Sequence, residues 1–171
     1  MKLRNPALFS WLKEWTPTER SGRLEAIYRA PAKGEPMELL EAVRVIAGGL
    51  EGDRYALGRG HWIKTDACAV TLSAHEDIER ANRKASGRFA QGEHRRNLVV
   101  SGIPIAAYRG RLLRIGEVVF RYHRLRPPCG YLERMLWRGA SKALGKASGI
   151  GLYVEKAGTI RVGDRAELID P

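Results

Sequence analysis

Short alternating runs of apolar residues, separated by glycine turns, constrain the fold of this chain more than any other feature. The runs lie at residues 22–29, 43–47, 67–72, 111–115, 118–122 and 151–169. Gly116 and Glu117 join two of them, which predicts a two-residue hairpin. Strand-like and helix-like segments do not alternate regularly, and this argues against a doubly wound sheet. The pattern predicts mixed β structure with some α: a β-barrel with a few helices packed outside.

Two segments have the apolar spacing of helices. In the first, residues 73–88, Ser73 followed by Glu76 matches a capping box, so the helix is expected to begin at Ser73. The second, residues 131–146, is expected to form one helix that ends before Gly149.

The length of 171 residues suits one domain with a single core. We expect residues 1–21 to form an N-terminal extension with a short helix at residues 9–15, and residues 22–171 to form the domain. No run approaches the roughly 20 apolar residues that span a bilayer, and no signal-peptide core is present. Cys68 and Cys129 are too far apart to suggest a disulfide framework. These features predict a reduced, cytoplasmic protein with no membrane association.

The formal charge of +11 comes mostly from arginine. Arginine binds phosphate and carboxylate through two parallel hydrogen bonds, so the charge predicts an anionic ligand. Nucleic acid, a phosphorylated small molecule and a merely solvated basic surface are the alternatives. The arginines are spread over the chain without a recognition-helix or aromatic-platform pattern, which makes nucleic acid the weakest of the three.

Cys129 lies in residues 126–132 (RPPCGYL), between a strand-like and a helix-like run. The prolines fix the backbone before the cysteine, and Gly130 leaves room for a ligand beside the sulfur. We interpret Cys129 as a metal ligand or nucleophile; the alternative is a small buried residue in a turn. Cys68 lies in an apolar run and is interpreted as structural.

Two further turns concentrate polar groups. The glycine-rich turn at residues 48–55 contains Asp53 and Arg54, but its spacing is neither a phosphate loop nor a dinucleotide fingerprint. His61 follows in a loop, as a ligand, an acid–base group or neither.

Arg95, Arg96 and Asn97 directly precede the branched apolar run at residues 98–100. Donors at the mouth of a strand are well placed to hold an anionic ligand with polar ring edges. The alternative is a solvated basic turn.

The order of these segments resembles the MOSC family, named for the C-terminal domain of molybdenum cofactor sulfurases. The resemblance covers about residues 22–169. The matching blocks are 49–54 (GLEGDR), 70–73 (VTLS), 95–102 (RRNLVVSG), 113–118 (LRIGEV), 128–129 (PC), 151–154 (GLYV) and 158–164 (GTIRVGD).

The resemblance implies a MOSC-type β-barrel and a role with the molybdenum cofactor, a molybdopterin. It implies that Cys129 is the catalytic residue, as the thiolate that binds molybdenum or as the acceptor that carries sulfur. Both roles require a thiolate and therefore an electropositive pocket, which Arg95, Arg96 or Arg126 can supply.

The same resemblance implies that the basic turn holds the pterin and its phosphate. The residues implied as cofactor-binding are Arg95, Arg96, Asn97, Asp53 and Arg54. For Asp53 and Arg54, a structural pair that braces the glycine turn is an equal alternative.

Stand-alone relatives resemble reductases of N-hydroxylated compounds, which receive electrons from another protein. The leading hypothesis is such a reductase, with a small-molecule substrate and an electron-donor partner, because no second cysteine lies near Cys129. The alternative is a non-redox carrier of the cofactor or of sulfur, with a persulfide on Cys129. A basic nucleic-acid-binding module is the third hypothesis. The sequence lacks the aminotransferase-like domain of the sulfurases, so pyridoxal phosphate is not expected.

Overall fold

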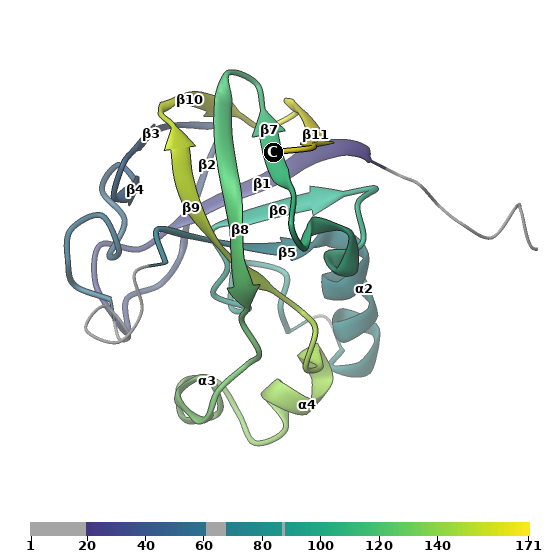
Figure 1. The fold of residues 1–171 in the computed structure, drawn as a ribbon. Coiled ribbons are helices and arrows are strands. Elements are labelled where there is room, and N and C mark those ends of the chain that lie inside the picture. The colour runs from purple at the N-terminus through teal and green to yellow at the C-terminus, as the bar shows by residue number, and fades with distance from the viewer. Residues whose placement is uncertain (1–19, 61–67, 87) are drawn as a thin grey trace, which may run out of the picture.

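The computed structural model describes residues 20–60, 68–86 and 88–171. Figure 1 shows a barrel of strands with the helices outside it. The strands are β1 (Ser21–Arg29), β2 (Glu38–Leu40), β3 (Ala42–Ile46), β4 (Gly49–Leu50), β5 (Val70–Ala74), β6 (Leu98–Ser101), β7 (Leu112–Ile115), β8 (Val118–Leu125), β9 (Ile150–Lys156), β10 (Gly158–Arg161) and β11 (Arg165–Ile169). The helices are α2 (His75–Lys84), α3 (Gly130–Met135) and α4 (Ala140–Leu144), with one 3₁₀ turn, η2 (Ile105–Tyr108).

Seven of the described strands close into a ring, in the order β11-β7-β8-β9-β5-β6-β1, because β1 also pairs with β11. β2 extends this sheet from β1, and β10, β3 and β4 form a separate three-stranded sheet. Neighbouring strands are antiparallel except β5 and β6, which run parallel and are connected through α2. A parallel pair needs such a crossover, since a tight turn cannot join two strands that run in the same direction. The β-barrel with peripheral helices is therefore confirmed.

Two apolar clusters hold these layers together. The first fills the barrel with inward-facing side chains such as Leu72, Ile115 and Phe120, none of which is exposed to solvent. The second lies under the helices and joins Ile78 of α2 to Leu132 of α3 and to residues of α4. Because this second cluster includes α3, it fixes the segment that begins at Cys129 against the outside of the barrel.

The capping box predicted at Ser73 and Glu76 is wrong. Ser73 lies within β5 and pairs with Val99, while its hydroxyl donates a short hydrogen bond to the carbonyl of Ser148. The carboxylate of Glu76 instead accepts a 2.8 Å hydrogen bond from the amide of Gly102. Because Ser73 and Ala74 pair with β6, α2 begins at His75, two residues after the predicted start, and is shorter than expected.

The single helix predicted over residues 131–146 is also wrong, because the segment forms α3 and α4 with a break between them. α3 ends at Met135, and the chain then turns through Gly139, the N-cap of α4, whose backbone is left-handed, φ 97°. The carboxylate of Glu133 accepts hydrogen bonds from the amides of Gly139 (2.7 Å) and Ser141 (2.8 Å). These bonds lower the pKa of Glu133 and close the turn between the two helices.

Within the described residues, no helix is both long and apolar enough to cross a membrane. The short helix predicted at residues 9–15 and the candidate His61 lie outside the described residues.

Candidate functional site

Cys129 lies at the junction that the sequence predicts, between the end of β8 and the start of α3. The amide of Arg126 donates a 2.8 Å hydrogen bond to the carbonyl of Gly149, which anchors the chain as it leaves β8. After Pro127 and Pro128, Cys129 is the N-cap of α3, and its backbone carbonyl accepts a 3.0 Å hydrogen bond from the amide of Leu132. Its side chain is half-buried. The thiol is thus held on a rigid segment and is reachable from outside.

A pocket of about 390 Å³ opens at this cysteine. Its wall joins the segment around Cys129 to the turn after β4 and to the turn before β6. The lining residues are Arg54, Tyr55, His94, Arg95, Arg96, Arg124, Arg126, Pro127, Pro128, Cys129, Tyr131 and Leu132. Five of these side chains are guanidinium groups and none is a carboxylate. The structure therefore brings Cys129 together with Arg54, Arg95 and Arg96 in an electropositive cavity.

Arg95 reaches the pocket through an unusual backbone conformation. Its backbone φ of 62° is in the left-handed region, which residues other than glycine rarely adopt. Its guanidinium donates to the carbonyl of Glu35, and its own carbonyl accepts a 3.3 Å hydrogen bond from Arg54. Burial, together with the neighbouring charge of Arg54, lowers the pKa of Arg95 to about 10. At neutral pH both groups are cations, so two positive charges are held close together on one wall.

Arg96 is fixed from the opposite wall. Its Nη2 donates a 2.5 Å hydrogen bond to the carbonyl of Arg126. Gly149 lies against the guanidinium so closely that a Cβ there would overlap Nε of Arg96. Burial lowers the pKa of Arg96, and the hydroxyl of Tyr55 and the thiol of Cys68 oppose that effect. The side chain is therefore part of the pocket wall and cannot swing freely into solvent.

Tyr55 contacts both Arg126 and Arg54. Its hydroxyl accepts a 3.3 Å hydrogen bond from Nη2 of Arg126, and the guanidinium of Arg54 lies 5.0 Å from its ring centroid. Such a cation–π contact holds the arginine plane against the ring. The aromatic ring thereby orients two guanidinium groups toward the same cavity.

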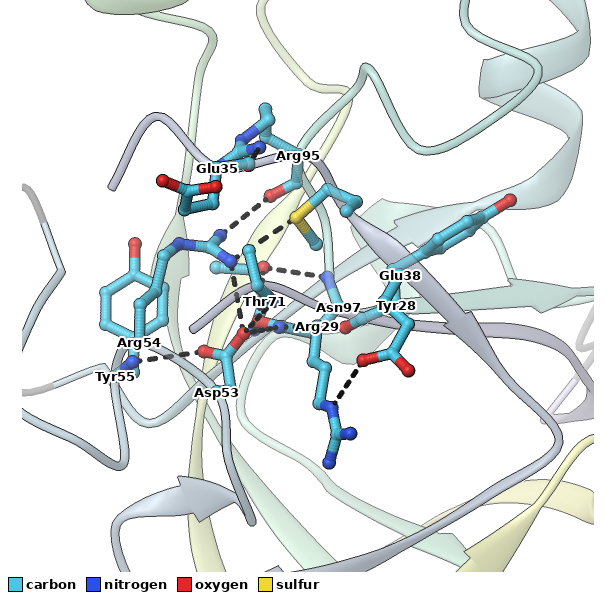
Figure 2. Close-up of polar contacts among 12 residues, drawn as sticks. Tyr28, Arg29, Glu35, Glu38, Asp53, Arg54, Tyr55, Thr71, Arg95 and Asn97 are labelled. Atoms are coloured by element: carbon cyan, nitrogen blue, oxygen red, sulfur yellow. Dashed lines mark hydrogen bonds and ion pairs between the residues drawn. The ribbon is translucent and has the colours of Figure 1, made fainter. Parts of the chain in front are cut away.

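Asp53 and Asn97 are fully buried and do not line the pocket. Figure 2 shows their polar contacts with each other and with Arg54. The carboxylate of Asp53 accepts hydrogen bonds from Arg54 and Asn97 and from the amides of Ala30 and Tyr55. The amide of Asn97 donates to Asp53 and to the carbonyl of Tyr28, and its oxygen accepts from Thr71. Both side chains are thus occupied by protein partners, and a direct role in cofactor binding stays a prediction.

His94 lines the pocket, and sequence reasoning did not select it. It is 2% exposed, and burial beside Arg96 and Arg95 lowers its pKa to about 3. Its Nδ1 accepts the amide of Arg96 at 3.1 Å, so the imidazole is neutral at physiological pH and helps to shape the basic turn. The only signal in the sequence was its position directly before Arg95, and a single histidine in a loop carries no spacing that predicts burial.

Cys68 is buried, 1% exposed, as expected for a structural cysteine. Its thiol donates to the carbonyl of Val70 at 3.0 Å, and burial raises its pKa. It packs behind Gly151, whose missing side chain leaves room for both Cys68 and the stem of Arg126. Cys68 therefore supports the wall on which Arg126 lies and does not line the pocket.

The arrangement combines one reachable thiol, five guanidinium groups and two aromatic rings. Guanidinium groups bind phosphate and other oxyanions with paired hydrogen bonds. A thiolate is a soft ligand that suits transition metals and is also the nucleophilic form of cysteine. The pocket is chemically suited to an anionic ligand that presents a metal or an electrophilic sulfur to Cys129.

Solved structures with the same fold are similar to this chain at low sequence identity. The YuaD protein from Bacillus subtilis matches with a TM-score of 0.71 and 16% identity, over 86% of this chain and 95% of that one. YiiM from Escherichia coli matches with a TM-score of 0.61 and 19% identity, over 87% and 70% of the two chains. YiiM from Geobacillus stearothermophilus matches with a TM-score of 0.60 and 17% identity, over 87% and 73%. A comparison with curated proteins found no match.

A family model described as the MOSC domain matches residues 57–167, well over half of the 171 residues. The match spans β5 to the start of β11 and includes Cys129 and the turn at Arg95 and Arg96. The chain therefore belongs to the MOSC domain family, which is associated with binding of the molybdenum cofactor.

Proposed function

We propose that this protein binds the molybdenum cofactor in the pocket at Cys129 and reduces N-hydroxylated small molecules with electrons from a partner protein. One observation carries the proposal: Cys129, on a rigid junction, shares a cavity with five arginines, and no carboxylate is among the described residues that line it. Family membership supports the cofactor, and the chemistry of the pocket supports its orientation, with the metal toward the thiol.

The residues fit the cofactor in charge, in donor type and in size. The cofactor's phosphate is an anion that Arg95 and Arg96 can bind, and its pterin edge suits the donors of the same turn. The thiolate of Cys129 is a soft metal ligand. The cavity of about 390 Å³ lies within the usual range for cofactor sites. Arg54 and Tyr55 complete the wall, and Asp53 and Asn97 position them from behind.

When bound, the molybdenum cofactor supplies the two-electron redox centre of the reaction. The protein contributes the fixed thiolate ligand, the positive charge that holds the anionic cofactor, and a half-buried cavity that limits water. The substrate gains two electrons and two protons, its N–O bond breaks, and an amine and water leave. His94 is neutral, so it adds no charge to the pocket beyond that of the arginines.

Metal analysis tests the proposal. Protein expressed in a host that makes the cofactor is expected to contain near-stoichiometric molybdenum and to convert an amidoxime to an amidine. The Cys129→Ala variant is expected to lose both, while Cys68→Ala, a matched control at the buried cysteine, keeps the metal. Full molybdenum content in a folded Cys129→Ala variant would contradict the assignment of Cys129 as the ligand.

The alternative is a carrier that transfers sulfur through a persulfide on Cys129. The observation that favours it is the same half-buried thiol among guanidinium groups, which would also stabilise an anionic persulfide. Mass spectrometry of the intact protein distinguishes the two functions. A sulfur adduct that is lost with reductant, and is absent in Cys129→Ala, supports the carrier; metal without any adduct supports the reductase.

A further inference from the structure

The helices beside the pocket carry a cluster of exposed cations, which we call the basic face. It consists of Arg83, Lys84, Arg88, Arg134, Arg138, Lys142 and Lys146, and all seven are exposed. They lie at the end of α2, just after it, and along α3 and α4. These helices pack on one apolar cluster, so the seven cations lie on neighbouring elements. Figure 1 shows α3 and α4 beyond the end of β8, away from β10 and β11.

The basic face is not neutralised by its own carboxylates. In residues 81–90 and 130–146 the sequence has a single acidic residue, Glu133, and its oxygens are taken by the amides of Gly139 and Ser141. Some exposed arginines elsewhere are ion-paired, as in Arg114 with Glu167 and Arg121 with Glu155. Among the described residues, no ion pair within 4.0 Å involves a cation of the basic face.

The basic face borders the mouth of the pocket. Cys129 caps α3, and the guanidinium of Arg134 lies 3.7 Å from where a Cβ on Gly130 would stand. On the other side of the cysteine, Leu125 is an exposed apolar side chain, 47% accessible, and Pro127 is also exposed. Protein–protein interfaces commonly combine an apolar centre with a polar or charged rim, and this surface has both.

From this placement we infer that the basic face is the docking surface for a small acidic redox protein, which delivers electrons at the mouth of the Cys129 pocket. The inference rests on the proposed reductase function, since the partner supplies the two electrons that break the N–O bond. As the substrate gains these electrons and two protons, the partner loses two electrons, either both from one reduced flavin or one each from two reduced iron–sulfur centres. Charge complementarity selects an acidic partner and speeds its encounter with this surface.

Nucleic acid fits this surface less well than an acidic protein. Helices α3 and α4 have 6 and 5 residues, which is too short to present a recognition helix to a major groove. The exposed large apolar residues of the described chain are Leu39, Leu57, Leu125 and Val162, and the two aromatic side chains near α3, Tyr131 and Trp137, are half-buried and do not form an exposed stacking platform. Trp137 is half-buried against Phe89, 4.9 Å between ring centroids, and is covered by Arg88.

Calorimetry at low and high ionic strength measures the affinity of the protein for an acidic flavodoxin. This experiment tests the docking surface without any turnover. The Lys142→Glu/Lys146→Glu variant is expected to bind about tenfold more weakly than the wild type, with a smaller salt dependence. The matched control is Arg44→Glu/Arg165→Glu, which makes the same charge change on β3 and β11 and is expected to bind like the wild type. No binding by the wild type, or equal loss in both variants, overturns the docking surface.

Turnover then separates this inference from the proposed function. With dithionite as the electron source, molybdenum-loaded wild type and Lys142→Glu/Lys146→Glu are expected to reduce an amidoxime at equal rates, whereas with reduced flavodoxin the variant is expected to be about tenfold slower at limiting donor. Absence of turnover with dithionite overturns the reductase and leaves the binding result standing. If the variant loses affinity for a single-stranded oligonucleotide or for phosphatidylserine vesicles but not for flavodoxin, the surface belongs to that ligand and the inference is wrong.

Discussion

The side-chain amide of Asn97 donates a 3.1 Å hydrogen bond to Oδ1 of Asp53, and neither side chain is exposed to solvent. The same carboxylate oxygen accepts from Arg54 at 3.1 Å. Asn97 directly precedes β6, and Asp53 lies in the turn after β4, so this contact joins the two turns that form the pocket wall. The arginines that face the cavity are thereby held from behind by a pair that does not touch it.

Replacing Asn97 by alanine is therefore expected to act through stability. The change removes four hydrogen bonds and leaves the buried amide of Thr71 and the carboxylate of Asp53 short of partners. An unsatisfied buried group costs about 1–3 kcal/mol, so we expect a loss of about 2–4 kcal/mol in the free energy of unfolding, measured by urea denaturation.

Asn82→Ala is the matched control for this change. Its amide oxygen accepts a single 2.9 Å hydrogen bond, from the amide of Phe89, so the expected loss is about 1 kcal/mol. An Asn97→Ala protein with wild-type stability but no bound molybdenum would contradict the positioning role and would show that Asn97 contacts the cofactor directly.

His94 is expected to make the fold sensitive to acid. Its pKa is about 3 in the folded protein against 6.5 for an ordinary histidine, so the unfolded chain binds more protons between these values. Stability is therefore fully present above about pH 6.5, falls as the pH drops, and has lost the whole contribution of His94 near pH 3. The loss is on the order of several kcal/mol, since each pKa unit corresponds to about 1.4 kcal/mol.

The variant His94→Asn keeps a hydrogen-bond acceptor for the amide of Arg96 but cannot be protonated in this range. Denaturation curves between pH 7 and pH 3 are expected to fall less steeply for this variant than for the wild type. His75→Asn, at the start of α2 where the side chain is 43% accessible, is the control for loss of an imidazole. Equal slopes in the wild type and His94→Asn would contradict the burial of a neutral His94.

Gly149 is expected to be required for the position of Arg96. A methyl group at this residue would overlap Nε of Arg96, and the guanidinium would have to leave the pocket wall. Gly149→Ala is expected to lower stability by about 1–3 kcal/mol and to reduce the molybdenum content of protein from a cofactor-producing host. Gly48→Ala is the control, because its added methyl would meet Ala56 at an ordinary 3.5 Å. Wild-type molybdenum content in Gly149→Ala would show that Arg96 is not needed for cofactor binding.

The sequence predicted most strands of the barrel, because short apolar runs bounded by turns mark strands whether they alternate, as β7 does, or are buried along their whole length, as β5 is. The hairpin of β7 and β8 at Gly116 and Glu117 is one example, and the strand at residues 22–29 is another. The two helix predictions were less accurate for a physical reason. Ser73 has the local pattern of a cap, but pairing with β6 gives its backbone stronger partners, and Glu133 closes a turn with residues six and eight positions away.

For the site, the sequence by itself determined the chemical groups: the cysteine fixed between prolines and a glycine, the paired arginines ahead of a strand, and the family to which the chain belongs. Tertiary structure decided which of them share a cavity. It turned Arg54 and Arg96 inward, placed Asp53 and Asn97 behind the wall, and brought His94 and Tyr55 to the pocket. Neighbours along a chain can point to opposite sides of a wall, and only the packing of the turns against the barrel fixes which side each one faces.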